Sequence, residues 1–234
     1  MKTERSKCIT LIVAVFVVIA TVAWDSGSQA QGEPAIAENL SAVHDVPEGW
    51  MPLFDGKTLH GWKILRYGGD GEPRVKNGVL VLPVATNTTM TGVCWTGEAL
   101  PVINYEVYYE ARRVAGSDIF AGLTFPYEDT FASLVFGGWG GSVNGLSSID
   151  GLDASQNETT QYFSLRNNYW YPVRLRVTTD SIRAIVGSAS VVDIATAGKD
   201  IHLRSDLLDT GFTLWNYLSA GEIRNLRIRK IPDF

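Results

Sequence analysis

The sequence contains only two cysteines, Cys8 and Cys94, in 234 residues. Cys8 lies in an N-terminal apolar run that we expect to be removed, so the mature chain cannot form an intrachain disulfide. Stability must therefore come from a hydrophobic core, which a mature chain of about 200 residues is long enough to bury. Cys94 stands between Val93 and Trp95 and is predicted to be a small core residue.

Several motifs are also missing. The sequence has no GxSxG elbow, no GxxxxGK[ST] loop and no GxGxxG after a strand, which argues against serine hydrolases of the elbow type and against nucleotide cofactors. The three histidines, His44, His60 and His202, are scattered, so no three-histidine zinc site is expected. The formal charge is -5, and basic residues cluster only near the two ends, which makes nucleic acid an unlikely partner.

The N-terminus has the pattern of a secretory signal. Three basic residues precede an apolar run over residues 8–24, and small polar residues follow up to Ala30. We predict a signal peptide over 1–30, a linker over 31–47 and one domain over 48–234. The mature protein is then exported to the periplasm or the cell exterior without a membrane anchor; the alternative is an uncleaved anchor.

No window shows an apolar stripe at helical spacing, and short strand-like runs recur between turn signals. Asn77-Gly78 between extended residues predicts a hairpin, and residues 173–178 and 182–186 predict a second one. Residues 104–114 alternate as a strand with one buried face should. Roughly a dozen strands without an internal repeat predict an all-β chain, folded as a two-sheet sandwich or jelly roll.

The segment 137–160 has no apolar periodicity and is predicted to be a long, ordered, functional loop. Four glycines flank Trp139, so its indole would stand clear as a stacking platform for a sugar ring. Asp150, Asp153, Asn157 and Glu158 add hydrogen-bond acceptors to the same segment. As hard oxygen donors these four also make a calcium site possible, although their spacing matches no EF-hand and a hydrogen-bonded loop is the default.

Five stretches carry a family resemblance: LFDGKTLHGWKI from Leu53, KNGVLVL, the whole of 137–160, WYPVRLRV and AGEIRNLRIRKI. Together they resemble the bacterial 3-keto-disaccharide hydrolase family over roughly residues 48–232. The resemblance implies a concanavalin A-like jelly-roll sandwich that is exported. It also implies action on, or binding of, glycosides whose C3 hydroxyl has been oxidised to a ketone.

A C3 ketone acidifies the C2 proton, so a base can remove that proton and the C1 substituent can leave, after which water adds back. Such a site needs a base, a donor to the enolate oxygen and an apolar wall. The candidate bases, with Asp153 as a further one, are Asp118, Glu128, Asp150 and Glu158. The candidate binding residues, with Ser147 as a further donor, are Arg112, Tyr127, Trp139, Asn144, Ser148, Asp153 and Asn157.

We expect Asp118 and Glu128 to flank one side of a concave face that the 139–158 segment closes. Each candidate also has a purely structural interpretation: Asp150 and Asp153 as turn formers, Trp139 as a plug, Arg112 as the partner of an acid. Besides an enzyme, two alternatives fit the sequence: a carbohydrate-binding module and a structural domain that binds another protein. An enzyme of this kind would depend on a sugar oxidoreductase for its substrate.

Overall fold

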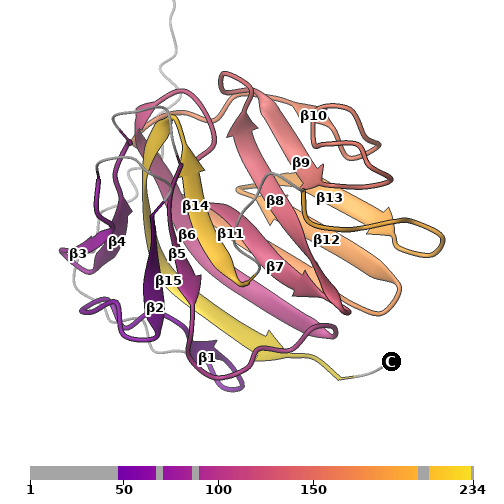
Figure 1. Cartoon of the computed structure of the whole chain (residues 1–234), viewed down its shortest axis with the longest axis horizontal. Coiled ribbons are helices and arrows are strands. Elements are labelled where there is room, and N and C mark those ends of the chain that lie inside the picture. The colour runs from indigo at the N-terminus through magenta and orange to yellow at the C-terminus, as the bar shows by residue number, and fades with distance from the viewer. Residues whose placement is uncertain (1–46, 67–70, 86–89, 205–210, 233–234) are drawn as a thin grey trace, which may run out of the picture. The chain divides into compact units, whose positions relative to one another are not determined.

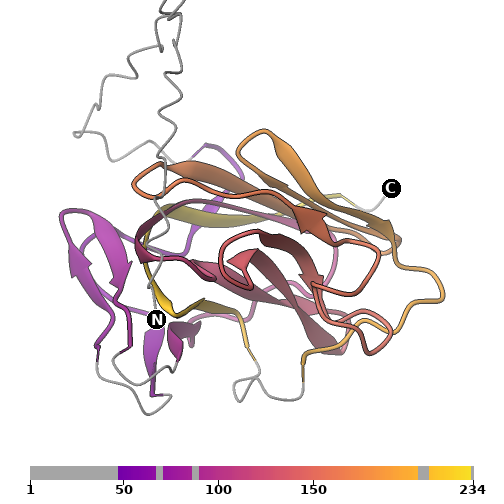
Figure 2. The ribbon, with the colours of Figure 1, turned by 90° about the horizontal axis from the view of Figure 1, so that it is seen from above.

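The computed structural model describes residues 47–66, 71–85, 90–204 and 211–232. Every regular element in these ranges is a β-strand, and the strands form two antiparallel sheets packed face to face (Figure 1, Figure 2). The prediction of an all-β jelly-roll sandwich is confirmed. Within the described ranges, no helix has the length and apolar character needed to cross a membrane. The predicted signal peptide and the linker up to residue 46 lie outside the described residues.

The first sheet has eight strands. In spatial order they are β13 (Ala189–Ala195), β12 (Ser181–Val186), β11 (Tyr171–Val177), β6 (Tyr105–Gly116), β15 (Ser219–Lys230), β4 (Val79–Leu82) and β3 (Arg74–Lys76), with β1 (Met51–Pro52) also paired to β15.

The second sheet has seven strands and lies in front of the first in Figure 1. Its order is β10 (Gln161–Tyr162), β9 (Val143–Ser147), β8 (Thr130–Gly138), β7 (Gly122–Tyr127), β14 (Thr213–Tyr217), β5 (Met90–Trp95) and β2 (Trp62–Arg66).

The two hairpins and the alternating strand that were predicted from the sequence are all present in the structure. Asn77 and Gly78 both have positive φ, 52° and 79°, and join β3 to β4, as the type I′ turn of a tight hairpin requires. Strand β6 alternates strictly between buried and half-buried residues along its first ten positions. Strands β11 and β12 form the second predicted hairpin. These three predictions are confirmed.

The main core lies between the two sheets, and hydrogen bonds cross it. Tyr105 and Tyr109 on β6 are fully buried, and their hydroxyls donate to the carbonyls of Pro126 (2.5 Å) and Ala121 (3.0 Å) at the other sheet. Burial raises the pKa of both phenols well above the ordinary value, so they remain neutral donors. The first sheet is thereby tied to β7 and to the turn before it.

Two expectations about local structure were wrong. Residues 137–160 are not one loop, because residues 137–138 end β8 and residues 143–147 form β9. All five residues of β9 are buried, so the strand shows no alternation, and Gly145 weakens its strand signal further. Cys94 is only half-buried and lies outside the core.

Candidate functional site

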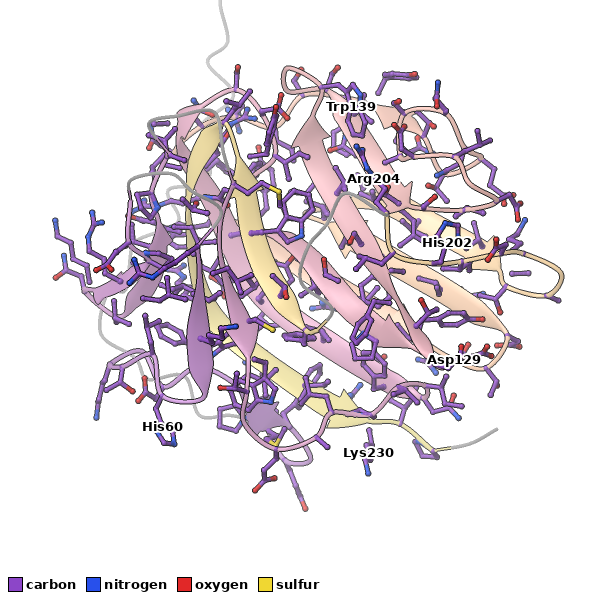
Figure 3. The ribbon with its side chains drawn as sticks, viewed as in Figure 1. His60, Asp129, Trp139, His202, Arg204 and Lys230 are labelled. Carbon is purple, nitrogen blue, oxygen red and sulfur yellow. The ribbon has the colours of Figure 1, made fainter. Side chains whose placement is uncertain are left out.

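A hollow of about 410 Å³ lies on the outer face of the seven-stranded sheet, and we call it the Trp139 hollow. Figure 3 shows Trp139 and Arg204 next to each other over β8 and β9. The residues that line the hollow come from four strands and four connecting segments: Met90, Asp118, Ile119, Ser133, Val135, Trp139, Ser147, Asp153, Arg204, Trp215 and Tyr217.

The floor of the hollow is the indole of Trp215 on β14. Its register partners on the two neighbouring strands are both glycines, Gly92 and Gly122. A Cβ at Gly122 would lie 3.0 Å from the Trp215 ring, and a Cβ at Gly92 would lie 2.8 Å from the Leu214 carbonyl oxygen. Gly122 therefore leaves the space that the indole needs, whereas Gly92 leaves room for the backbone of β14. Trp215 is only 5% exposed.

A row of hydroxyl side chains crosses four strands of this sheet. Thr213, Thr124, Ser133 and Ser147 are register neighbours on β14, β7, β8 and β9. The Trp215 Nε1–H donates to Thr124 Oγ1 (3.2 Å), and the hydroxyls of Thr124 and Ser133 share a hydrogen bond (2.9 Å). Ordered hydroxyls thus lie beside the indole floor.

Ser147 ends this row without a partner. Its side chain is 2% exposed, and its Oγ makes no hydrogen bond to any described residue. A buried polar group left unpaired costs about 1–3 kcal/mol, so such groups in folded proteins call for an explanation. Since Ser147 also lines the hollow, a ligand hydroxyl or carbonyl is a natural partner for it.

Asp118 positions the segment that carries Trp139. Its Oδ1 accepts the backbone N–H of Ile119 (2.8 Å) and its Oδ2 accepts the backbone N–H of Gly140 (2.9 Å). Trp139 itself has a φ of 49°, which the glycines on either side help the turn to accommodate, and its side chain is 43% exposed. The indole is therefore a wall of the hollow that a ligand can reach.

Asp153 supplies the second carboxylate of the hollow. Its Oδ1 accepts the N–H (2.8 Å) and the hydroxyl (2.6 Å) of Ser155, which fixes the side-chain orientation. Its Oδ2 lies 3.8 Å from Arg204 Nη1. The hollow thus combines a carboxylate and a guanidinium with the unpartnered Ser147 hydroxyl and the exposed indole.

The structure does not bring Glu128 and Tyr127 to this hollow. Glu128 lies in the turn between β7 and β8 and, with Tyr127, lines a different depression that also contains Lys199 and His202. The expectation that Asp118 and Glu128 flank one concave face was wrong. Strand β7 separates them, since Asp118 precedes this strand and Glu128 follows it.

Three acceptors of the predicted sugar-binding segment already have structural partners. Asp150 Oδ1 accepts the Asp200 N–H (2.8 Å), and Glu158 forms an ion pair with Lys199. Asn157 Oδ1 accepts the N–H (2.9 Å) and the hydroxyl (2.7 Å) of Thr159. The described residues contain no group of three or more His, Cys, Asp or Glu that could hold a metal ion.

The remaining candidates also have structural partners. Arg112 lies on the other sheet, where it pairs with Glu222 and stacks on Trp170. The Asn144 amide is fully buried, donates to the carbonyls of Ser142 and Phe163, and accepts the Gly137 N–H. The Ser148 hydroxyl donates to the Leu152 carbonyl (3.2 Å).

Sequence reasoning missed Trp215 and Arg204. Trp215 could be singled out only through its two glycine partners, and this requires knowledge of which strands pair. Arg204 lies 51 residues after Asp153, and no local pattern connects the two. Trp139, Asp118, Asp153 and Ser147 were candidates from the sequence, and the structure places all four in one hollow.

Residues 49–229 match the 3-keto-alpha-glucoside-1,2-lyase-like domain. The chain belongs to this family. The resemblance seen in the sequence is therefore confirmed, and the match spans both sheets and every residue that lines the Trp139 hollow.

Solved structures share the fold of this family member at low sequence identity. A candidate glycosyl hydrolase from Parabacteroides distasonis has 15% identity and a TM-score of 0.51, over 79% of this chain and 95% of that one. The Crh5 transglycosylase in complex with NAG has 8% identity and a TM-score of 0.57, over 79% and 85%. No curated protein sequence matches the chain. Family and fold together indicate a jelly-roll domain of the glycosyl hydrolase-like or carbohydrate-binding type.

Proposed function

We propose that the Trp139 hollow binds a 3-keto-glycoside and cleaves it by elimination followed by hydration. The observation that carries the proposal is the buried, unpartnered Ser147 hydroxyl, because it lies in the same hollow as the Asp153 carboxylate and the exposed Trp139 indole. These three groups match the donor, the base and the wall that the reaction needs. Membership of the 3-keto-alpha-glucoside-1,2-lyase-like family supports the choice of substrate.

Asp153 is the proposed general base. Its Oδ1 is held by Ser155, whereas its Oδ2 has only the more distant Arg204 guanidinium as a neighbour among the described residues. Oδ2 takes the C2 proton, and the electrons of the C–H bond form the enolate of the C3 ketone. The enolate then re-forms the ketone as the C1 substituent leaves, which creates a double bond between C1 and C2.

Ser147 and Arg204 are the proposed donors to the enolate oxygen. Both groups would stabilise the negative charge that develops on the enolate oxygen. The Ser147 hydroxyl is neutral and already buried, and the Arg204 guanidinium lies at the edge of the hollow. Asp118 positions Trp139 through the Gly140 N–H and is not assigned a proton-transfer role, because both of its carboxylate oxygens already accept backbone N–H groups.

Water then adds to C1 as a hydroxyl group, and its other proton goes to the departed alkoxide, which is released as the free alcohol. Asp153 returns its proton to C2, and the 3-keto sugar is restored. The substrate must come from a reaction that oxidises a glycoside at C3, so we propose that a sugar oxidoreductase precedes this protein. We also propose that the chain is exported, since its N-terminal sequence has the features of a secretory signal.

The test is turnover of a 3-keto-glucoside by Asp153→Asn, with Glu158→Gln as the matched control. Both substitutions remove one carboxylate from the same segment, but only Asp153 lines the hollow. We expect Asp153→Asn to lower kcat by about 100- to 10,000-fold, the usual contribution of a general base, and Glu158→Gln to keep wild-type turnover. Full activity of Asp153→Asn contradicts the assignment. An equal loss in Glu158→Gln would favour the role for Glu158 that the sequence suggested.

A second function, carbohydrate binding without turnover, is favoured by one feature. Of the four carboxylate oxygens of Asp118 and Asp153, three already accept hydrogen bonds and the fourth faces a guanidinium. A wild-type protein that binds glycosides, loses that binding in Trp139→Ala and turns over no member of a 3-ketoglycoside panel would establish this alternative.

A further inference from the structure

A second hollow lies on the opposite side of the sandwich, on the outer face of the eight-stranded sheet. Its volume is about 440 Å³, within the range of about 300–1,000 Å³ that is usual for ligand sites. We call it the arginine hollow, because its charged lining residues are one glutamate and five arginines: Glu106, Arg174, Arg176, Arg183, Arg227 and Arg229.

Three of these arginines have carboxylate partners. Glu106 accepts from Arg176 (3.3 Å) on one neighbouring strand and from Arg229 on the other. Arg183 pairs with Asp193 (2.9 Å) at the edge of the sheet. Two carboxylates therefore face three guanidiniums, and this part of the hollow keeps a surplus positive charge.

The adjacent row of the sheet has no carboxylate. Arg174 and Arg227 are the register partners of Tyr108 on its two sides. Their guanidinium carbons lie 5.8 and 4.2 Å from the centre of the Tyr108 ring, and neither guanidinium forms an ion pair with a described residue. Two like charges thus share one aromatic ring at the centre of the hollow.

Arg227 has a further unsatisfied group. Its Nε–H is buried and makes no hydrogen bond within the described residues, while its guanidinium also lies 5.3 Å from the centre of the Trp50 ring. Arginines that protect a sheet from aggregation lie on its edge strands, whereas Arg227 lies on β15 in the interior of the sheet. A buried donor held between two aromatic rings suits the recognition of an anion better.

We propose that the arginine hollow binds the carboxylate groups of an acidic oligosaccharide, with Arg174 and Arg227 as the principal contacts. A planar guanidinium matches a carboxylate in two parallel hydrogen bonds, and Trp50 offers an apolar surface beside it. The chain as a whole is acidic, with a formal charge of -5, which disfavours polyanions of high charge density such as nucleic acids. A uronate chain carries one charge per sugar and meets less repulsion.

The test measures binding of a short oligogalacturonate to the full chain by calorimetry at low and at physiological salt. The variants are Arg174→Gln and Arg227→Gln, which remove the charge but keep a planar polar group. The control is Arg66→Gln on β2, an exposed arginine of the other sheet that pairs with Glu72. A lost charge-assisted hydrogen bond of about 1.5–3 kcal/mol corresponds to a tenfold or greater weakening, which we expect for both test variants and not for the control.

Three results overturn the proposal: no oligogalacturonate binding by the wild-type chain, equal binding by Arg227→Gln, or tighter binding of a DNA oligonucleotide or of anionic phospholipid vesicles at the same salt. Turnover of a 3-keto-glucoside should be unchanged in Arg227→Gln, because the arginine hollow and the Trp139 hollow share no residue. Failure of this proposal is therefore distinguishable from failure of the proposed function.

Discussion

The two outer faces of the sandwich differ in the burial and in the charge of their side chains. On the seven-stranded sheet, the outward residues of β7, β8 and β9 near the Trp139 hollow are hydroxyl and apolar side chains, and they are almost fully buried. On the eight-stranded sheet, the outward residues of β6 and β15 are mostly Arg and Glu, and they are half-buried. The outward strand residues are thus buried and uncharged near the Trp139 hollow, and half-buried and mostly charged on the other face.

This difference bears on what each face can do. The ion pairs at the arginine hollow are partly exposed, so each individual pair contributes little to stability, about 0–1 kcal/mol for exposed examples. The Ser147 hydroxyl at the Trp139 hollow is buried, and an electrostatic interaction is stronger away from water. Catalysis that stabilises developing charge is therefore better placed on the first face, and recognition of an existing charge on the second.

The largest predicted difference between the two faces is the loss of stability when a tryptophan on each face is replaced by alanine. Trp215→Ala removes a buried indole from above Gly92 and Gly122 and should lower the free energy of unfolding by about 3–5 kcal/mol. Trp50 on the other face is only half-buried, so Trp50→Ala should lower it by clearly less. Denaturant unfolding of both variants measures the difference, and equal losses would contradict the contrast between a buried and a half-buried face.

A second comparison uses two neighbouring serines. Ser147→Ala should lower turnover of a 3-keto-glucoside by about 100- to 1,000-fold, as loss of an oxyanion donor does elsewhere. It should not lower stability and should raise it if anything, since the buried hydroxyl has no hydrogen-bond partner to lose. Ser148→Ala removes a donor to the Leu152 carbonyl and should do the reverse, with a stability loss of about 1 kcal/mol and normal turnover. A stability loss in Ser147→Ala without a kinetic effect would refute the assigned role.

The smallest effect concerns acid stability on the charged face. Burial alone would raise the pKa of Glu110, but hydrogen bonds from Asn225 and Arg224 hold it below its ordinary value. A lowered pKa in the folded state means that the ionised group stabilises the fold above its unfolded pKa, and that this contribution is lost as the pH falls through the folded pKa. Glu110→Gln should therefore destabilise the protein at neutral pH and flatten the fall in stability on acidification. Parallel pH profiles of unfolding for the two proteins would contradict this.

Structural features that depend on residues adjacent in the sequence could be predicted. Features that depend on which strands pair with each other could not. The Asn77-Gly78 turn and the alternation of β6 are local, and both were predicted correctly. Trp139 and Asp153 were candidates because their residue types and flanking residues suit a sugar. Strand β9 was missed because both its faces are buried, and Trp215 was missed because its glycine partners lie more than 90 residues away along the chain.

The most direct test of the central claim is a crystal structure of Asp153→Asn soaked with a 3-keto-glucoside. The sugar should lie in the Trp139 hollow, with its ring against the Trp139 indole and its C3 oxygen within hydrogen-bond distance of Ser147 Oγ. A sugar bound only at the depression beside Glu128, or only at the arginine hollow, would contradict the account.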